Sequence, residues 1–409
     1  MISLQHPEIL EHLKLLDYGL QPVFMRDTNS FSLIIKAPKE VILTARTENK
    51  FKVYLIKDKA EPPSLLGLMT AFFDDHDEPL VISSPMLKED RLMEDLAKLF
   101  TQETFNLYFF DENNRELLGV IAANPDFSKF RSDISILEAT EFEPSEALIF
   151  LKKMQTLFAY RTVIEDDDAF TIHLGERLYD DDLAIIDARD ESTGFQTIES
   201  PISITTLERE GSPGSMQERD IAQLMARMFT ADQIFLNPFR IDTDREITDV
   251  LVVSENYLIF IQAKDSPNTE KILSRKIQRK RETIRAHISK ATKQIRGALS
   301  YAQTNNEMVL KGNDENISIP TTGKQLVGLV IVKELFDDEY IECSAPILKV
   351  IRDLEVPIAL LDFSQLHTLT HNFSNSDELI DGLYNMVDIA LENDQFPKAV
   401  WSGVPREKT

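Results

Sequence analysis

The chain has very little cysteine and no long apolar stretch. Cys343 is the single cysteine among 409 residues, which excludes an internal disulfide and a zinc site built from several thiolates. No apolar run approaches the roughly 18–20 residues that a membrane-spanning helix needs. The first residues also lack a basic stretch followed by a continuous apolar one, so no secretory signal is expected. These absences predict a cytoplasmic protein in a reducing compartment, with no membrane partner.

Basic charge is also scarce, and it is unevenly distributed. Lys and Arg total 44 against 69 Asp and Glu, a net charge of -25, and an average of this sign repels nucleic acid. Residues 1–200 hold 20 basic and 38 acidic side chains, net -18, whereas residues 264–296 hold 11 basic and 3 acidic, net +8. A local basic segment in an acidic chain favours contact with phosphate at that segment.

The length of 409 residues exceeds one ordinary domain and predicts two or three. Residues 1–205 are expected to form an acidic, mixed α+β domain for sensing, targeting or oligomerisation. Residues 206–215 include Glu-Arg-Glu-Gly-Ser-Pro-Gly-Ser and are interpreted as a linker, because glycine, serine and proline interrupt regular structure. An α/β (α+β) domain over 216–395 and a tail over 396–409 complete the expected organisation.

The first domain is expected to mix helices and strands. Apolar periodicity and turn signals predict helices over 7–20, 87–100 and 144–159, and strands over 31–36, 41–47, 52–56, 105–110 and 116–122. Two acidic clusters, Glu165–Asp168 and Asp180–Asp182, are interpreted as solvated loops in preference to cation sites. His173 between them is interpreted as a strand residue, because no second His or Cys lies at ligand spacing.

The second domain has the predicted element order α-β-β-β-α-β, followed by β-α. Its first helix is expected over 216–230, with Ser215 as its N-cap and Glu218 three residues later. Strands are predicted over 233–239, 247–253 and 257–263. A long helix over 275–304 has isoleucines at helical spacing. Strands over 325–332 and 356–361 and a helix over 377–391 follow.

Three polar residues mark one end of the apolar hairpin at 247–263. Asp249 lies near the start of its first strand, and Gln262 and Lys264 lie at the end of its second. Residues two apart on a strand face the same side, and antiparallel pairing is expected to place Asp249 beside them. Carboxylate and amide oxygens suit a hard divalent ion such as Mg²⁺. The ammonium suits negative charge that develops at a phosphate under attack.

This pattern resembles the PD-(D/E)XK nuclease superfamily, the fold of restriction endonucleases, over about residues 215–375. The acidic position of that family matches Asp249. Its (D/E)XK motif matches Gln262-Ala263-Lys264, in which Gln replaces the acid, and Mrr-like restriction enzymes look similar in this respect. The nuclease-related NERD domain is a second resemblance. In such proteins an acid on the helix before the strands often joins the metal site, and Glu218 matches it.

The resemblance implies a restriction-endonuclease-like core and a hydrolase acting on phosphodiester bonds of DNA, in restriction or antiviral (anti-phage) defence. Asp249, Gln262, Lys264 and Glu218 would be its catalytic residues, and Mg²⁺ or Mn²⁺ would be held by Asp249, Gln262 and Glu218. Duplex DNA is the favoured partner, because no aromatic residue lies between 264 and 296 to stack on single-stranded bases. A homo-oligomer and a partner protein of a defence system are further expectations.

The long basic helix is expected to supply the DNA contacts, mostly from the face opposite its isoleucines. The expected contact residues are Arg275, Lys276, Arg279, Lys280, Arg281, Arg285, Lys293 and Gln294. Gln294 is included because a Gln and a Tyr on this helix assist the site in the RecB-like branch of the superfamily. Here Tyr301 follows Gln294 by seven residues and not by four. His287 is interpreted as a packed or exposed residue in preference to a general base.

Two other functions remain open at this level. The chain could be a nuclease-fold module that has lost catalysis and only holds DNA or a protein partner. Salt-sensitive DNA binding without metal-dependent cleavage would indicate that class. It could instead be an interaction protein whose acidic N-terminal half mimics DNA and engages a basic partner. Capture of a basic protein by residues 1–205 alone would indicate that class.

Overall fold

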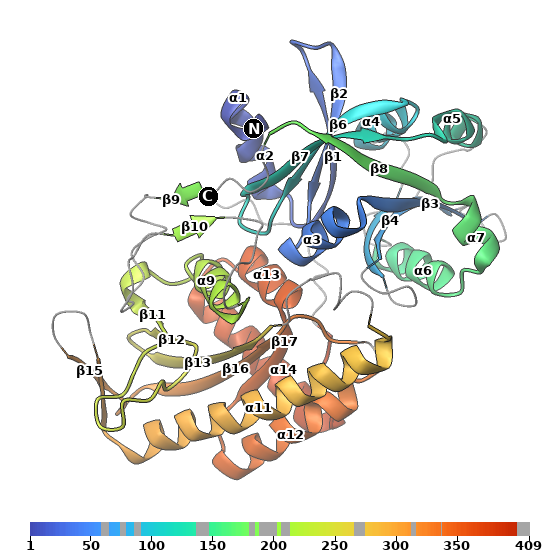
Figure 1. Ribbon diagram of the computed structural model, residues 1–409. Helices are drawn as coiled ribbons and strands as arrows, with labels where there is room; N and C mark the ends of the chain where they lie inside the picture. The colour runs from blue at the N-terminus through green and yellow to red at the C-terminus, as the bar shows by residue number, and fades with distance from the viewer. Residues whose placement is uncertain are drawn as a thin grey trace. The chain divides into compact units, whose positions relative to one another are not determined.

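The computed structural model describes residues 1–58, 65–73, 79–85, 91–135, 147–179, 185–187, 203–205, 213–265, 275–311, 316–336 and 338–398. The chain divides into two compact units, Met1–Leu183 and Ala184–Pro267 with Lys276–Thr409. Each unit mixes helices and strands (Figure 1). The acidic cluster Asp180–Asp182, most of the predicted linker and the end of the predicted tail lie outside the described residues. Within those residues, no helix is long and apolar enough to cross a membrane.

The first unit is built on an eight-stranded sheet in the order β1-β2-β6-β7-β8-β3-β4-β5. Its neighbours are antiparallel except for the parallel pair β2 and β6. The strands are β1 (Gly19–Met25), β2 (Ser30–Lys36), β3 (Lys50–Asp58), β4 (Leu65–Phe72), β5 (Leu80–Pro85), β6 (Thr104–Phe110), β7 (Glu116–Ala123) and β8 (Phe170–Arg177). The helices are α1 (Ile2–Gln5), α2 (Glu8–Leu15), α3 (Lys39–Glu48), α4 (Arg91–Phe100), α5 (Phe127–Ser135), α6 (Ala147–Ala159) and α7 (Val163–Asp168).

Two of the elements predicted for the first unit differ from the structure. The segment 41–47, predicted as a strand, lies within helix α3, where Val41 to Ala45 are all buried. A β-branched run has strand propensity, but burial on all sides removes the alternation that would distinguish the two structures. The helix predicted over 7–20 ends at Leu15, since the backbone of Leu16 is extended. The buried Lys36 ammonium donates hydrogen bonds to carbonyls at that end, including Leu13 at 3.0 Å.

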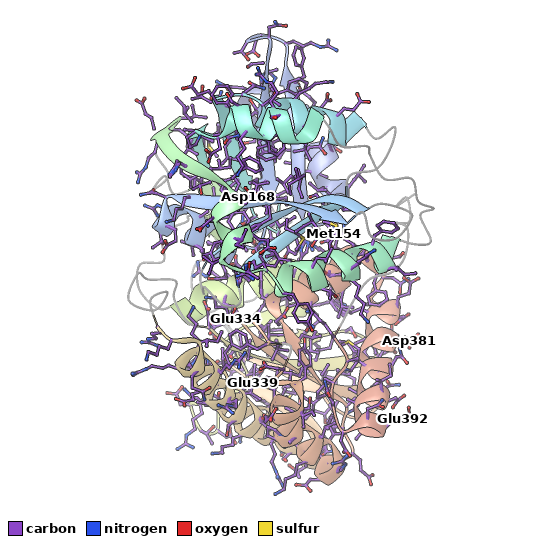
Figure 2. All side chains as sticks on the ribbon, turned by 90° about the vertical axis from the view of Figure 1, so that its right-hand side faces the viewer. Met154, Asp168, Glu334, Glu339, Asp381 and Glu392 are labelled. Atoms are coloured by element: carbon purple, nitrogen blue, oxygen red, sulfur yellow. The ribbon has the colours of Figure 1, made fainter. Side chains whose placement is uncertain are left out.

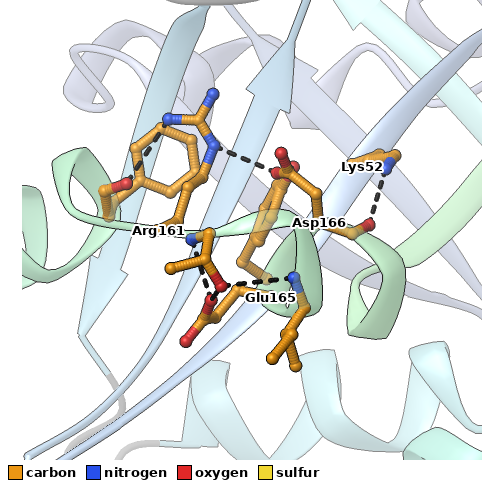
Figure 3. Close-up of polar contacts among 8 residues, drawn as sticks. Lys52, Arg161, Glu165 and Asp166 are labelled. Atoms are coloured by element: carbon orange, nitrogen blue, oxygen red, sulfur yellow. Dashed lines mark hydrogen bonds and ion pairs between the residues drawn. The ribbon is translucent and has the colours of Figure 1, made fainter.

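The acidic cluster Glu165–Asp168 forms helix α7 and makes structural contacts (Figure 3). Glu165 and Thr162 form a capping box at its N-terminus. The Asp166 carboxylate accepts a 2.7 Å hydrogen bond from the Tyr54 hydroxyl and pairs with Arg161 at 3.1 Å. Burial and the neighbouring Asp166 raise the pKa of Tyr54 above its ordinary value. These contacts tie α7 to β3, so the interpretation of this cluster as a solvated loop is corrected.

The second unit has a five-stranded sheet in the order β11-β12-β13-β16-β17. The first three strands form an antiparallel meander, and β13, β16 and β17 are parallel. They span β11 (Ile234–Leu236), β12 (Val250–Val253), β13 (Tyr257–Lys264), β16 (Gln325–Val332) and β17 (Ile358–Asp362). Two smaller ladders join β9 (Ile185–Asp187) with β10 (Ser203–Thr205), and β14 (Glu307–Leu310) with β15 (Ile317–Pro320).

Helices cover both faces of this sheet (Figure 1). Helices α9 (Pro213–Met225) and α13 (Phe363–Asn372) lie on one face; α11 (Ile277–Thr304), α12 (Tyr340–Leu354) and α14 (Ser376–Asn393) lie on the other. A short 3₁₀ helix, η2 (Ala231–Gln233), precedes β11. Apolar side chains of all these layers form one continuous core. On α14, Asp381 and Glu392 are exposed on the side away from the sheet (Figure 2).

The predicted order of strands in the second unit agrees with the structure, and the 325–332 strand has the predicted bounds. The hairpin β14–β15 and helices α12 and α13 were not predicted. The Ser215 cap is wrong: α9 begins at Pro213, since proline is well suited to the first turn of a helix. Glu218 therefore does not belong to a capping box.

The close approach of α11 to the sheet is testable at Gly328 in β16. A Cβ there would lie 2.9 Å from both Ile295 on α11 and Ile358 on β17, so Gly328→Ala should lower the free energy of unfolding by about 1–3 kcal/mol. Gly297 on α11 has no atom within 4 Å of an added Cβ, and Gly297→Ala should raise it by about 0.5–1 kcal/mol. Denaturant unfolding followed by circular dichroism measures both. Equal effects of the two changes would contradict this packing.

Candidate functional site

Pairing of β12 with β13 brings the predicted site residues together. Val250 lies opposite Ile261, so Asp249, one residue earlier, reaches the end of β13. There one oxygen of its carboxylate accepts a 2.6 Å hydrogen bond from the backbone N–H of Ala263. The neighbouring Thr248 hydroxyl donates to the Ile261 carbonyl at 2.7 Å. Asp249 is buried, with 6% of its surface exposed, and its position follows from the register of this hairpin.

The Lys264 ammonium lies between the two side-chain oxygens that the motif supplies, those of Asp249 and Gln262. It is 3.1 Å from Oδ2 of Asp249 and 3.4 Å from Oε1 of Gln262, and it donates to the Ala263 carbonyl at 2.7 Å. The amide nitrogen of Gln262 donates to Thr248 at 3.3 Å, which directs its carbonyl oxygen toward Lys264. The carboxylate and amide oxygens therefore converge on one positive charge.

Helix α9 brings Glu218 to the same place through Asn237. The Asn237 side chain donates to Glu218 at 3.0 Å, and its backbone N–H donates to the Asp249 carbonyl at 2.9 Å. Asn237 has a φ of 47°, a left-handed conformation that asparagine tolerates better than most residues. Burial, together with the nearby Asp249 charge, raises the pKa of Glu218. The four predicted catalytic residues thus form one cluster.

Glu246 is a member of this cluster that the motif did not indicate. The residue is exposed overall, yet its carboxyl group interacts electrostatically with Asp249, Glu218 and Lys264. Partial burial, followed by the charge of Asp249, raises the pKa of Glu246 to about 8. Asn237 was missed as well. The Asn237-Pro238 dipeptide is a turn signal, but nothing in the sequence connects that turn with Glu218.

His287 faces the site from helix α11. It is half-buried, and burial, with smaller effects of the Lys264 and Lys290 charges, lowers the pKa of its imidazole. The ring is therefore favoured in its neutral form. His287 lies between Ile284 and Ile288, which are buried in the core, so of the two expected positions, packed or exposed, it has the packed one.

The charge balance of the cluster suits a divalent cation. The carboxyl groups of Glu218, Glu246 and Asp249 interact with the charge of one lysine, Lys264, and burial together with the Asp249 charge raises the pKa values of Glu218 and Glu246. A second positive charge would relieve this repulsion. The available donors are carboxylate and amide oxygens, the ligands that Mg²⁺ and Mn²⁺ prefer. The residues therefore fit a cation of this class.

Of the eight residues predicted to contact DNA, five lie toward solvent, and the other three are buried or paired with acids. Lys276, Arg279, Lys293 and Gln294 are exposed, and Arg275 is partly exposed. By contrast, Lys280 is buried, with 8% of its surface exposed, because it lies on the same helical face as Ile277 and Ile284. Its expected place on the solvent face is corrected.

Arg281 and Arg285 lie against the segment that leads into α12. Arg281 pairs with Asp338 at 3.0 Å, and its guanidinium lies 5.3 Å from the ring centroid of Phe336. Arg285 pairs more distantly with Glu339, at 3.8 Å. These acids offset part of the basic charge of α11. The exposed part of the basic surface is thus smaller than the sequence suggested.

Among the described residues, Gln294 and Tyr301 have no contact with the four candidate catalytic residues. Tyr301 stacks against Arg240, whose guanidinium lies 3.5 Å from the ring centroid. Among the contacts of the described residues, none joins Gln294 to Asp249, Gln262 or Lys264.

Comparison of the chain with protein-family models, with curated proteins and with solved structures gives no significant match. Any functional conclusion therefore depends on the geometry and chemistry of the cluster itself.

The raised pKa of Glu246 has a measurable consequence for stability. Between pH 4.5 and about 8 the folded protein retains a proton that the unfolded chain has lost, so the free energy of unfolding falls as pH rises through this range. In metal-free buffer, Glu246→Gln should raise the melting temperature at pH 8, and the gain should shrink at pH 5. The control Glu255→Gln, at the exposed β12–β13 turn, should not reproduce this gap. A gain of the same size at both pH values would contradict the assignment.

Proposed function

We propose that the chain is a divalent-cation-dependent deoxyribonuclease that hydrolyses phosphodiester bonds. The observation that carries the proposal is the convergence of Asp249, Gln262 and Lys264 at the end of one hairpin. The element order around them also fits a restriction-endonuclease-like core. A helix bearing Glu218 precedes the meander, and a long helix crosses from β13 to the parallel strand β16.

Asp249, Glu218 and Gln262 would hold a Mg²⁺ or Mn²⁺ ion through their side-chain oxygens. When bound, such an ion polarises a phosphoryl oxygen and lowers the pKa of coordinated water. Lys264 would stabilise the negative charge that develops on the phosphate. Its ammonium is held by the Ala263 carbonyl at 2.7 Å, which keeps it at the site through a contact that does not involve the acids.

Helix α11 offers a surface for the DNA backbone beside the cluster. His287 interacts electrostatically with Lys264, so it lies near the level at which β13 ends. At a rise of 1.5 Å per residue, residues 277–286 extend about 15 Å beyond His287 along the helix axis. Figure 1 shows this N-terminal part of α11 extending past the ends of the strands. The exposed Lys276 and Arg279 lie at this end and would contact phosphates of a duplex next to the cleaved bond.

The biological setting is proposed from the resemblance to Mrr-like and NERD-bearing proteins. Restriction or antiviral defence would be the role, with the first unit serving sensing, targeting or oligomerisation. This step is an analogy between folds, which by itself does not determine function. The chemical proposal does not depend on it.

Loss of Lys264 tests the catalytic assignment. With plasmid DNA and Mg²⁺ or Mn²⁺, the wild-type protein should linearise or degrade the substrate, and Lys264→Ala should reduce the rate by about 10²-fold or more. Lys349→Ala removes an exposed lysine on α12 and should cut like the wild type. Equal rates for the wild type and Lys264→Ala would overturn the assignment. Salt-sensitive DNA binding without metal-dependent cleavage by the wild type would instead indicate a binding module.

The two groups of basic residues on α11 should behave differently. Lys276→Gln combined with Arg279→Gln should weaken duplex binding and reduce the slope of log affinity against log salt by about 0.9 for each phosphate that is no longer neutralised. Arg281→Gln removes an ion pair and a ring contact, so it should mainly lower thermal stability. Fluorescence anisotropy with a labelled duplex, measured at several salt concentrations, checks the first result. An unchanged salt slope in the double variant would exclude this helix end as the DNA-binding surface.

A further inference from the structure

We infer that Glu246 is a further ligand of the divalent cation, binding it together with Asp249. The inference rests on the proposed function, since it assumes that a cation binds beside Asp249. It goes beyond the motif, which assigns Asp249, Gln262 and Glu218 and contains no residue at the Glu246 position.

A short antiparallel β-ribbon, formed by residues 238–240 and 245–247, fixes the backbone of Glu246. Phe239 and Glu246 form an antiparallel bridge, supported by hydrogen bonds from Arg240 N–H to the Arg245 carbonyl and from Ile247 N–H to the Pro238 carbonyl, both 2.9 Å. The backbone of Glu246 is therefore paired with that of Phe239, on the strand of the ribbon that continues into β12. Three residues later the chain reaches Asp249, so the ribbon and the hairpin of the site form one continuous structure.

The hairpin β14–β15 supports the other side of this ribbon. Arg240 forms a bridge with Leu310, the Lys311 N–H donates to the Phe239 carbonyl at 2.8 Å, and the Ile241 N–H donates to the Val309 carbonyl at 3.3 Å. Side chains add to this, since Arg240 stacks on Tyr301 and Lys311 pairs with Asp244 at 2.9 Å. A segment inserted between α11 and β16 thus fixes the position of a residue at the site.

The carboxyl group of Glu246 lies near the groups that the cation would bind. Its charge interacts with those of Asp249, Glu218 and Lys264, and the ribbon fixes its backbone three residues before Asp249. Two neighbouring carboxyl groups can present one oxygen each to a single divalent ion. Because Glu246 is the exposed member of the cluster, it can engage a cation that enters from solvent while Asp249 stays buried.

Binding of Mn²⁺ to the full-length protein, measured by calorimetry at pH 7, tests the inference without relying on activity. Wild type should bind Mn²⁺, Asp249→Asn should lose binding, and Glu246→Gln should bind about tenfold or more weakly. Glu255→Gln is the matched control, because the same substitution removes the same charge at the exposed β12–β13 turn, outside the ribbon, and it should bind like the wild type. Thermal unfolding in EDTA verifies that each variant is folded.

The possible results distinguish the role of Glu246 as a ligand from the existence of the metal site itself. Wild-type affinity in Glu246→Gln, with binding lost in Asp249→Asn, would overturn the role of Glu246 and leave the proposed site intact. Equal weakening in Glu255→Gln and Glu246→Gln would show that the effect of Glu246 is one of net charge alone and would also overturn its role as a ligand. No Mn²⁺ binding by the wild type would overturn both the inference and the proposed function.

Discussion

The pairing of β12 with β13 is the constraint on which the site depends. It places the buried Asp249 carboxylate beside the backbone N–H of Ala263 and the ammonium of Lys264. A slip of one residue in this register would move Gln262 and Lys264 to the opposite face of the sheet. Burial on both faces, between α9 with α13 and α11 with α12 and α14, makes such a slip costly. The stability of the core and the geometry of the site are therefore linked.

The charges that matter at the site are those of its immediate neighbours and not the net charge of the chain. The chain has a net charge of -25, yet the acids that matter lie around one lysine and beside a basic helix. Some of the cations on that helix are already paired, as in Arg281 with Asp338. Under the proposed function, such pairs would restrict DNA contact to the exposed helix end near Lys276 and Arg279. They would thereby limit binding at other parts of α11.

The sequence was informative where local pattern and buried packing agree. The apolar run at 325–332 and the isoleucine spacing of α11 predicted a buried strand and a long helix, and both are present. Gln262 and Lys264, two apart on a strand, were predicted to face one side, and their side chains do meet. Where burial surrounds a segment, as for Val41 in α3, the pattern carries no period and the prediction failed.

The remaining part of the site depends on contacts between distant segments. Asn237 joins α9 to β12 through two hydrogen bonds, and Glu246 depends on a ribbon that is held by residues more than 60 positions later in the chain, Leu310 and Lys311. Such long-range pairings leave no periodic signal in one sequence. The same holds for Lys280, whose burial follows from how α11 packs and not from its charge.

The central claim is that the Asp249 cluster binds a divalent cation. A crystal of the full-length protein soaked in Mn²⁺ tests it most directly, because anomalous scattering locates the ion independently of activity. An anomalous peak is expected within about 2.5 Å of side-chain oxygens of Asp249 and Glu218. A saturating soak that leaves no peak at this cluster, with Lys264 still bridging Asp249 and Gln262, would contradict it.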